Sequence, residues 1–565
     1  MTIVDKFCGT VALYPNKAAL KSEAEGSLTY CELDKYSNYI ARRVLSEYSG
    51  GDGIVGICLD RSFMMIASML GVLKAGKSYL PLDPNYPSER LQLMLSKSSV
   101  KFIICADDTA HLFGDSYAKL LIRNREYINE PPTISIDPHS LAYIQYTSGS
   151  TGSPNGVMVT HHSILNTLVW RINYYGLNQF DSNLQIPSFS FASSVEDIFC
   201  TLLSGGTLIL IKSKDLLNTR LIRHLVEKHA VTHLLMVPSL FKEVLKELGG
   251  IESLRFVVVA GEKLQHKLVD EHYVALPQTV LYNEYGMTET SVACMVCRIG
   301  KGDESIFIGN TIDNMDSLIY DPDEDGIGEL YISGHGLSIG YHNDAEATQY
   351  RFVFIDAVRY FKTGDFVKLS ADGNLQFIGR RDNQMKINGQ RVDFSEIDYV
   401  LQQDGLVSES ITCCIDYRNK ESIVSFIKTS SNNYDYFSDL LKKRLPKYYV
   451  PDYIKLKKEF TYLPNKKIDV KGMKDLFVNK LEEVAMTSDP MFEKICKVLR
   501  DVASKELQLE NNTDIQKSGI DSIEYIQFLA GIEEVFDFEF GYDYMEKLGT
   551  VSIVSLYDYL KSLGK

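Results

Sequence analysis

The segment that most constrains this chain is a loop rich in glycine and hydroxyl side chains at residues 146–157, with the sequence YTSGSTGSPNGV. It follows the run LAYIQ at residues 141–145, whose pattern predicts a strand that leads into a flexible loop. Glycines let backbone N–H groups curl around an anion, and serine and threonine hydroxyls add donors. The segment therefore predicts a polyphosphate-binding loop, although its composition alone also fits a mobile polar linker. It is not a Walker loop, because no Gly-Lys-Ser/Thr sequence closes it.

The loop resembles the phosphate loop of adenylate-forming enzymes, in particular that of the adenylation domains of nonribosomal peptide synthetases. Other segments match the motifs of that family in their usual order. They are 73–76 (LKAG), 79–84 (YLPLDP), 283–290 (NEYGMTET), 328–334 (GELYISG), 360–365 (YFKTGD), 379–386 (GRRDNQMK) and 463–469 (LPNKKID). One such match carries little weight, whereas the full set in register is very specific.

Short apolar strands alternate with helical patterns over most of the chain. The strand candidates include 54–58, 102–105, 207–211 and 256–260, and residues 64–74 are helix-like. This alternation predicts an α/β fold with largely parallel sheets. Near the C-terminus, apolar residues recur with helical spacing at 495, 498, 499 and 502 and again at 523, 526, 529 and 532, which predicts a small helical bundle.

The resemblance and these patterns together predict the domain organisation. We expect a large N-terminal adenylation subdomain (1–381), a small mobile α/β subdomain (382–477), a linker (478–489) and an all-α, four-helix peptidyl carrier (thiolation) domain (490–565). Asp382 matches the hinge residue of the family, about which the small subdomain is expected to rotate between adenylation and thiolation.

The segment SGIDSIE at residues 518–524 lies in the predicted bundle. Asp521 and Glu524 form a capping pair, which places Ser522 in the first turn of a helix. On that ground alone Ser522 is only a helix-start residue. The segment also resembles the attachment site of carrier proteins, which implies a 4'-phosphopantetheine cofactor on Ser522 and a phosphopantetheinyl transferase as the partner that adds it.

The composition excludes several classes of partner. The formal net charge of −15 argues against binding to nucleic acid or to an anionic membrane, which require basic patches. The N-terminus lacks the apolar core of a signal peptide, and no uncharged apolar run reaches bilayer length. Ten cysteines in 565 residues do not make a disulfide framework, and the lone CxxC at 294–297 is a weak zinc or redox signal. We therefore expect a cytoplasmic location.

The resemblance also implies roles for residues of the matching motifs. It implies ATP and Mg²⁺ as cofactors, with Glu289 as the magnesium ligand and Lys467 as the mobile catalytic lysine that bridges the substrate carboxylate and the phosphate. Without the PNKKID context, Lys467 would be one more surface lysine. The residues implied to contact the nucleotide or its phosphates are Thr147, Ser148, Gly149, Thr151, Asn283, Tyr285, Gly286, Thr288, Asp365 and Arg380.

The phosphate loop departs from the family pattern at its end. That pattern usually ends Lys-Pro-Lys-Gly, whereas residues 153–156 read SPNG, with Asn155 in place of a lysine. Two cations are lost from a loop that is to hold a triphosphate, so we expect slower adenylation.

Residues 189–199 (FSFASSVEDIF) align without gaps to the family segment that supplies substrate contacts. Ala192 stands where an aspartate normally pairs with the α-ammonium group of an amino acid, and alanine cannot do this. Ser193 and Glu196 share the helix face that the family turns into the pocket. The resemblance completes the substrate pocket with Met236, Val258, Ala260, Glu284, Val292 and Ala293.

Glu196 and Glu284 would place two carboxylates in one desolvated pocket, which is costly unless they are paired or one is protonated. A cationic group of the substrate would provide that pairing. We therefore favour a carboxylic acid that carries an amine or guanidine at a β or more distant carbon. If Glu196 lies on a solvated helix face, the pocket is essentially neutral and suits an amine-free hydroxy, keto or aryl acid. An ordinary α-amino acid is a third alternative.

These observations predict an enzyme, an acid or amino acid–carrier protein ligase that activates a small carboxylic acid with ATP and loads it on its own carrier. A free acyl-CoA ligase and an inactive platform that only presents a carrier are the alternatives. The presence of Ser522 argues against the first, and Lys467, Glu289 and Asp365 argue against the second. Because no condensation or thioesterase segment is recognisable, downstream synthetase or tailoring enzymes would take the acyl group in trans.

Overall fold

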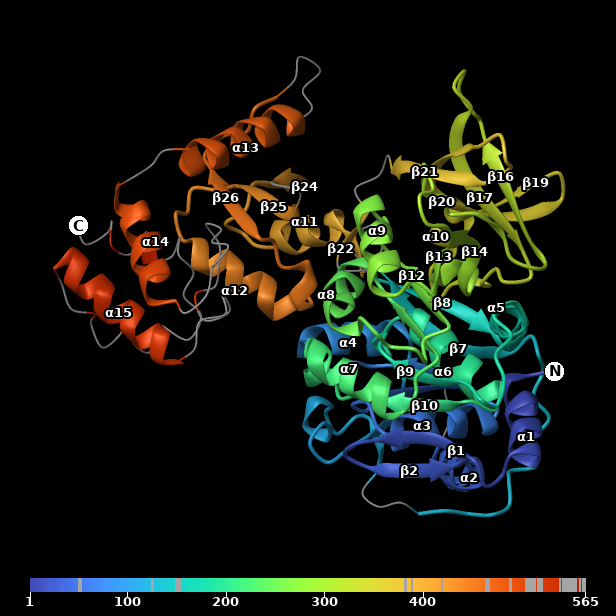
Figure 1. Cartoon of the computed structure of the whole chain (residues 1–565). Helices are drawn as coiled ribbons and strands as arrows, with labels where there is room; N and C mark the ends of the chain where they lie inside the picture. The colour runs from blue at the N-terminus through green and yellow to red at the C-terminus, as the bar shows by residue number, and fades with distance from the viewer. Residues whose placement is uncertain are drawn as a thin grey trace. The chain divides into compact units, whose positions relative to one another are not determined.

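The structure is a computed structural model. It describes residues 1–48, 53–122, 126–147, 154–380, 384–387, 390–417, 420–462, 468–486, 490–503, 515, 522–537, 540, 556–557 and 560. The chain divides into two units, Met1–Glu459 and Phe460–Lys565 (Figure 1). Within the described ranges no helix is both long enough and apolar enough to cross a membrane.

The first sheet of the first unit is parallel in its middle and antiparallel at both edges. Its strand order is β15 (Asn310–Thr311), β14 (Val292–Ile299), β13 (Val280–Met287), β12 (Phe256–Ala260), β11 (His233–Met236), β9 (Ser182–Gln185), β10 (Thr207–Leu210), β1 (Ala18–Ser22) and β2 (Gly26–Thr29). One face packs in a common core with α7 (Thr219–Lys228), α8 (Pro238–Leu248) and α9 (His266–Ala275).

The second sheet contains the strands on both sides of the glycine-rich loop. Its order is β18 (Gly340–Tyr341), β8 (Asn155–Thr160), β7 (Leu141–Thr147), β4 (Ser78–Pro81), β3 (Ile54–Cys58), β5 (Phe102–Cys105) and β6 (Ala118–Leu121). One face packs with α4 (Ser88–Lys97). Between the two sheets lies a shared core with α1 (Ile3–Leu13), α2 (Tyr30–Glu47), α3 (Phe63–Lys74), α5 (His161–Tyr174) and α6 (Ser193–Leu203).

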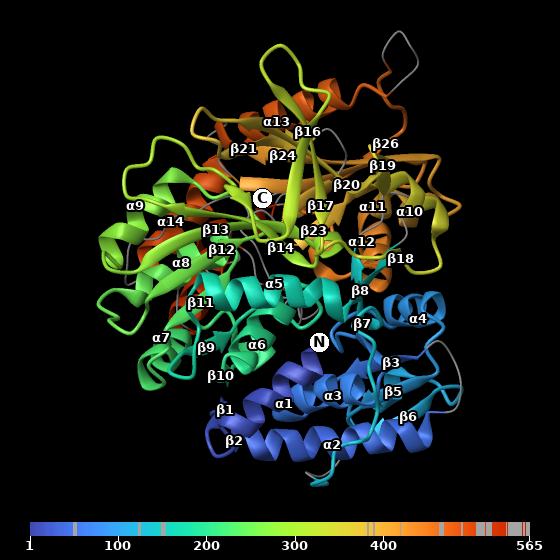
Figure 2. The same cartoon turned by 90° about the vertical axis from the view of Figure 1, so that its right-hand side faces the viewer.

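The local sequence patterns predict several of these elements correctly. The strands expected at 54–58, 102–105 and 256–260 are β3, β5 and β12, and α3 begins one residue before the expected helix because the Ser62 side chain caps it. The first two sheets are largely parallel, as predicted, with antiparallel ladders at their edges. Figure 2 shows α5, which contacts α6 and β14.

A third sheet follows in the order β16 (Met315–Tyr320), β17 (Ile327–Gly334), β20 (Val358–Leu369) and β19 (Phe352–Ile355), with β21 (Leu375–Arg380) paired to β20 and α10 (Ala345–Arg351) before β19. Short 3₁₀ helices lie at Ala110–Leu112, Ser213–Asp215, Thr288–Thr290 and Lys447–Tyr449.

The small subdomain, defined here as residues 384–457, has an apolar core of its own. Its elements are the hairpin β22 (Gln384–Ile387) and β23 (Gln390–Asp393), then α11 (Phe394–Gln402), β24 (Glu409–Tyr417), β25 (Lys420–Lys428), α12 (Tyr434–Arg444) and β26 (Tyr453–Lys457). β24 pairs antiparallel and β26 parallel with β25. Residues 384–457 thus form an α/β arrangement around this core within the first unit, whereas the predicted subdomain (382–477) extends across the division at residue 459.

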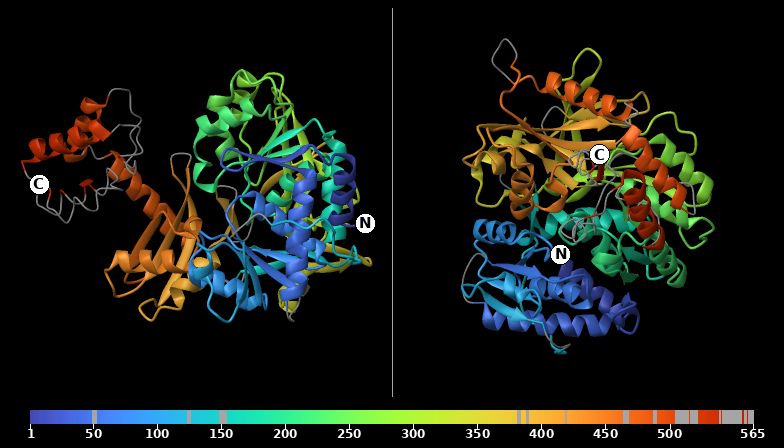
Figure 3. Two further views of the ribbon diagram at one scale, coloured as in Figure 1. Left: turned by 90° about the horizontal axis from the view of Figure 1, so that it is seen from below. Right: turned by 90° about the vertical axis from the view of Figure 1, so that its left-hand side faces the viewer.

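The second unit contains α13 (Val470–Met486), α14 (Pro490–Val502) and α15 (Ser522–Phe536), coloured orange to red in Figure 3. Helices α14 and α15 pack through a small core that includes Leu499 and Ile532. The predicted four-helix bundle extends over residues outside the described ones and stays a prediction. The predicted linker at 478–489 is helical as far as Met486, because its polar sequence is rich in helix-forming Leu, Lys, Glu, Ala and Met.

Candidate active site

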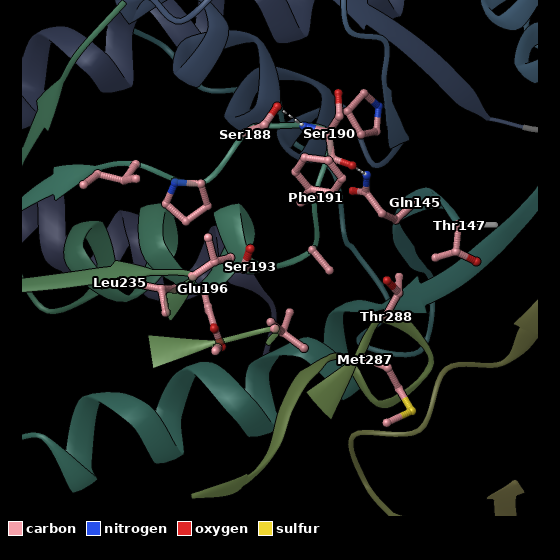
Figure 4. Close-up of a pocket in the computed structure, with 18 of the residues that line it drawn as sticks. Gln145, Thr147, Ser188, Ser190, Phe191, Ser193, Glu196, Leu235, Met287 and Thr288 are labelled. Carbon is pink, nitrogen blue, oxygen red and sulfur yellow. Dashed lines mark hydrogen bonds between the residues drawn. The ribbon is translucent and has the colours of Figure 1, made fainter. Parts of the chain in front are cut away.

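A cavity of about 330 Å³ lies at the carboxyl ends of strands β11, β12 and β13. The start of α6 and the end of β7 contribute further walls. Open α/β sheets bind ligands at this edge, because loops and helix ends converge there. Figure 4 shows Phe191, Ser193 and Glu196 on one side of the cavity and Thr147, Met287 and Thr288 on the other side in that view.

The phosphate loop connects two strands whose ends are paired. Thr147 at the end of β7 is the register partner of Asn155 at the start of β8, and its hydroxyl donates to the Asn155 carbonyl at 3.5 Å. Thr147 lines the cavity. Ser148, Gly149 and Thr151, the other residues predicted to contact phosphates, lie outside the described residues.

Strand β13 brings the predicted adenine and ribose residues together. Tyr285 lines the cavity, and its hydroxyl donates to Asp365 on β20. Arg380 on β21 forms an ion pair with Asp365 and donates to the Thr363 carbonyl at 3.1 Å. Burial, followed by the neighbouring Asp365 carboxylate, raises the pKa of Tyr285 well above its ordinary value. Residues from three separate motifs therefore form one hydrogen-bonded group beside the cavity.

Gly286 and Thr288 also line the cavity. A Cβ atom at Gly286 would lie 1.8 Å from the Val292 carbonyl oxygen, so only glycine fits there. Ser291 and Val292 have φ angles of 54° and 80°, which is an uncommon conformation for a β-branched residue. The backbone thus turns sharply between the predicted nucleotide residues and the predicted acid pocket.

Several predicted residues lie near the cavity without lining it. Asn283 is buried and its amide donates to the Phe307 carbonyl at 2.8 Å. Glu289 is buried on the 3₁₀ helix next to Thr288, and its carboxylate accepts from the Tyr341 hydroxyl at 2.8 Å. Asp365 and Arg380 do not line the cavity, but Asp365 accepts from Tyr285, which does.

The placement of Val258 corrects one pocket prediction. Val258 does not line the cavity and instead packs in the core between the two sheets. Ala260 lies two residues further along β12 and lines the cavity. Alternate residues of a strand share a face, so Val258 is on the correct face but one repeat too deep in the sheet.

Three predicted residues cannot be placed in the site. Asp382 and Lys467 lie outside the described residues. Ser522 is the first residue of α15, which agrees with the helix start predicted from its sequence, and its side chain is not among those described.

The predicted acid pocket is one end of the cavity. Ala192 precedes the first turn of α6 and offers no charged group. Ser193 and Glu196 follow on the same helix, and the rest of the predicted wall comes from strand ends. Apart from Val258, all the predicted substrate residues line the cavity: Ala192, Ser193, Glu196, Met236, Ala260, Glu284, Val292 and Ala293.

Arg171 is the residue that sequence reasoning missed. It lies near the end of α5, is only 2% exposed, and its guanidinium forms an ion pair with Glu284. The same nitrogen, Nη1, is 3.5 Å from Oε1 of Glu196. The Tyr175 hydroxyl donates to Oε1 of Glu284 at 2.6 Å. We call Arg171, Glu196 and Glu284 the pocket triad.

The triad perturbs the titration of its members. Burial raises the pKa of Glu196 well above its ordinary value, the Arg171 cation opposes this, and the Glu284 and Asp197 carboxylates add to it. Burial lowers the pKa of Arg171, but the two glutamates outweigh burial and raise it. The triad therefore favours a charged Arg171 and shifts Glu196 toward its protonated form.

This geometry bears on the predicted substrate cation, because the chain contributes a cation of its own to the pocket. The sequence argument required a cation for two buried carboxylates and assigned it to the substrate, whereas the chain supplies it from Arg171. A signal was present in the sequence, because Arg171 follows Ile164 and Leu168 at helical spacing and so falls on a buried face. A cation on such a face needs buried anions.

The small subdomain supplies another wall of the cavity. Tyr448 and Tyr449 line it, with the Tyr448 ring 6.3 Å from that of Phe191 and its hydroxyl 3.5 Å from that of Tyr86. Arg90 on α4 and Glu396 on α11 form a buried ion pair across the same contact. The cavity is therefore built by both the small subdomain and the rest of the first unit.

Comparison with known proteins identifies relatives along the chain. The profile of the AMP-binding enzyme family matches residues 8–342. Bacitracin synthase 3 of Bacillus licheniformis is 37% identical over 475 residues, which are 81% of this chain and 7% of that protein. Tyrocidine synthase 3 of Brevibacillus parabrevis is 34% identical over 480 residues, 81% of this chain and 7% of that protein. The chain thus spans only a small part of the length of these relatives.

Solved structures show the same fold. Holo-PA1221, described as an NRPS protein containing adenylation and PCP domains, superposes with a TM-score of 0.74 at 20% identity, covering 94% of this chain and 91% of that chain. NpsA-ThdA from Klebsiella oxytoca, an artificially fused adenylation–PCP di-domain, gives a TM-score of 0.71 at 24% identity, covering 80% of this chain and 93% of that chain. Together with the profile match over more than half of its length, these likenesses show that the chain belongs to the AMP-binding enzyme family.

Proposed function

We propose that this chain activates a small carboxylic acid with ATP as an acyl-adenylate and transfers the acyl group to a phosphopantetheine thiol on Ser522. The proposal is carried by one observation: residues from the predicted phosphate side and from the predicted acid pocket line the same cavity. They are Thr147, Tyr285, Thr288 and Glu196. A carboxylate held in the pocket would meet an α-phosphate held by the loop. The similarity to peptide synthases over most of the chain supports the same reaction.

In the first half-reaction an oxygen of the substrate carboxylate attacks the α-phosphorus of ATP. The bond from that phosphorus to the oxygen bridging the β-phosphate breaks, and pyrophosphate leaves with the electron pair. Two anions must approach each other, so the site has to supply donors and cations. Thr147 and Thr288 offer hydroxyls on the phosphate side, Tyr285 offers a ring for adenine, and Lys467 would bridge the carboxylate and the phosphate.

The donor set near Thr288 fits a magnesium ion. Among the described residues no group of three or more His, Cys, Asp or Glu side chains is placed to hold a metal. Mg²⁺ bound to nucleotide phosphates needs only one or two protein carboxylates, and the buried Glu289 can serve as one. When bound, the ion would supply positive charge to the phosphates.

In the second half-reaction the thiol sulfur attacks the acyl carbon of the adenylate. The bond from that carbon to the phosphate oxygen breaks, AMP leaves, and the thiol proton passes to solvent. Ser522 begins α15, a position where helix amides favour an attached phosphate. Rotation about Asp382 would exchange Lys467 for the carrier arm.

The proposal is tested by ATP–pyrophosphate exchange and by thioester loading after treatment with a phosphopantetheinyl transferase. We expect Lys467→Ala to lose most adenylate formation with little change in ATP binding, and Lys466→Ala to resemble the parent. Ser522→Ala should keep exchange and lose loading, whereas Ser518→Ala should keep both. Equal pyrophosphate release by Lys467→Ala and the parent would contradict the role of Lys467.

The same experiment separates the alternatives. Turnover with free coenzyme A that is unchanged in Ser522→Ala, without acyl loading of the parent chain, would indicate an acyl-CoA ligase. Attachment of phosphopantetheine to Ser522 without exchange or acyl loading would indicate an inactive platform. A loaded carrier would pass its acyl group to downstream synthetase or tailoring enzymes acting in trans.

A further inference from the structure

We infer that Arg171 determines the class of substrate by neutralising the buried carboxylates of the pocket. The pocket then accepts a carboxylic acid that presents a hydrogen-bond acceptor to Glu196, and it disfavours an acid that presents an ammonium group there. The inference rests on the proposed adenylation function and names the class of acid that this site takes. It replaces the amine-bearing acid favoured by the sequence with the amine-free hydroxy, keto or aryl acids.

Glu284 is already paired with a cation inside the chain. Both of its carboxylate oxygens accept from Arg171, and one also accepts from the Tyr175 hydroxyl. The side chains of Arg171 and Glu284 are 2% and 1% exposed, so solvent does not screen their attraction. The pair is electrically neutral, and its role is to hold the pocket wall.

Glu196 is the member of the triad that can contact a substrate. Its Oε1 lies 3.5 Å from Nη1 of Arg171. Oε2 is buried and, within the part of the chain that the structure describes, has no hydrogen-bond partner. A buried polar atom of this kind is costly unless a ligand satisfies it. Because Glu196 lines the cavity, the substrate is the group placed to do so.

The charge of Glu196 decides which group that is. Arg171 directs its hydrogen bonds to both oxygens of Glu284, so a second carboxylate buried beside that pair is favoured in its neutral form, in which Oε2 can donate. Burial raises the pKa of Glu196 in the same direction. A keto, hydroxyl or ring oxygen of the substrate would accept that hydrogen bond. A substrate ammonium group would have to ionise Glu196 and would then lie close to the Arg171 cation, which repels it. Ala192 offers no alternative anion.

The test compares kcat/KM in ATP–pyrophosphate exchange for pairs of acids of matched size, one amine-free and one bearing an amine. We expect the parent to prefer the amine-free member of a pair by at least about tenfold, equivalent to about 1.4 kcal/mol. Arg171→Met leaves two carboxylates without their cation and should shift that ratio toward the amine-bearing acid by at least about tenfold. Arg223→Met, in an ion pair on the outer surface of α7, is the control and should not change the ratio.

A second variant protects the test against misfolding of Arg171→Met. Replacing Arg171 and Glu284 together by methionine removes a neutral buried pair, which proteins tolerate better than a lone buried charge. This double variant should keep the preference for amine-free acids. Glu196→Ala should raise KM for the amine-free acid about tenfold, and Glu196→Gln, which retains a donor, should raise it less.

The outcomes separate this inference from the proposed function. A parent enzyme that prefers amine-bearing acids, or an Arg171→Met variant whose preference equals that of the parent, would overturn the inference and leave adenylation in place. Equal losses in Glu196→Ala and Glu196→Gln would show that Glu196 acts through its charge, which also overturns it. Absence of exchange with every acid of the panel would overturn the proposed function itself.

Discussion

Replacing Arg90 by methionine should release the small subdomain from the wall of the cavity. Arg90 on α4 and Glu396 on α11 form an ion pair whose side chains are 6% and 2% exposed. Burial lowers the pKa of Arg90, but the Glu396 carboxylate and the Tyr449 and Tyr448 hydroxyls outweigh it and raise that pKa above its ordinary value. The other carboxylate oxygen of Glu396 has no partner within the described residues, so Arg90 is the group that compensates its charge.

The size of the effect follows from burial on both sides. Removing one partner of a buried ion pair costs about 3–5 kcal/mol, because the remaining charge is left uncompensated. The small subdomain has its own core and can stay folded while it separates, so this cost should appear as loss of docking. Replacing both Arg90 and Glu396 by methionine should cost less than about 1 kcal/mol, because an apolar pair fills the same space.

Hydrogen–deuterium exchange of the peptides that cover α4 and α11 measures this docking directly. A loss of about 3 kcal/mol should accelerate exchange there by about 100-fold in Arg90→Met, and the double variant should recover most of the protection. The one tryptophan of the chain, Trp170 on α5, reports whether the rest of the first unit stays folded. KM for the acid should rise, because Tyr448 leaves the cavity wall.

The control variant is Lys443→Met, which removes an ion pair with Glu89 across the same contact. That pair is exposed, at 74% and 46%, and should contribute less than about 1 kcal/mol. If Arg90→Met exchanged as slowly as the parent, or as fast as the double variant, the buried pair would not be what holds the small subdomain and the reasoning would be refuted.

Three further predictions concern single positions. Gly286→Ala should lose at least about 2 kcal/mol of stability and most exchange activity, because its Cβ would overlap a carbonyl oxygen. The control Gly9→Ala, at an exposed position of α1, should raise stability by about 0.5–1 kcal/mol without changing activity. Burial raises the pKa of Asp398 to about 6. The pKa of an aspartate in the unfolded chain is about 3.9. Below that pH the protonated Asp398 makes its full contribution to the free energy of unfolding, and about 3 kcal/mol of that contribution is lost as the pH rises to about 6. Thermal unfolding between pH 4 and 7.5 should show a flatter dependence in Asp398→Asn, and identical slopes would contradict the assignment. Tyr285→Phe, which loses the hydrogen bond to Asp365 but keeps its ring, should raise KM for ATP by about 3- to 10-fold, and an unchanged KM would separate that bond from nucleotide binding.

The parts of the fold that local sequence determines were predictable. The strands at 54–58 and 256–260 and the helix after Ser62 follow from apolar periodicity and a capping side chain, which need no knowledge of the rest of the chain. The residues that line the cavity on α6 and β13 were found through their motifs. The helical state of the stretch before α14 did not follow from its polarity, because polarity is shared by linkers and by surface helices.

The parts that depend on distant contacts were not predictable from local patterns. Arg171 and Glu284 are 113 residues apart, and the local sequence around either residue does not predict their contact. The depth of Val258 along β12 depends on how far the neighbouring strands and α6 extend, which one strand does not specify. The partner of Arg90 lies more than 300 residues further along the chain, in another subdomain.

The pocket triad also limits how this site can diverge. Its charge is shared by α5, α6 and β13, three separate segments of the chain, so a mutation that changes one member leaves a buried imbalance for the other two. If the α6 segment alone were replaced by that of a relative with another substrate, the new α6 side chains would lie next to the unchanged Arg171 guanidinium. A change of specificity in this chain therefore requires compensating substitutions on α5, and grafts that omit that helix should yield poorly active hybrids.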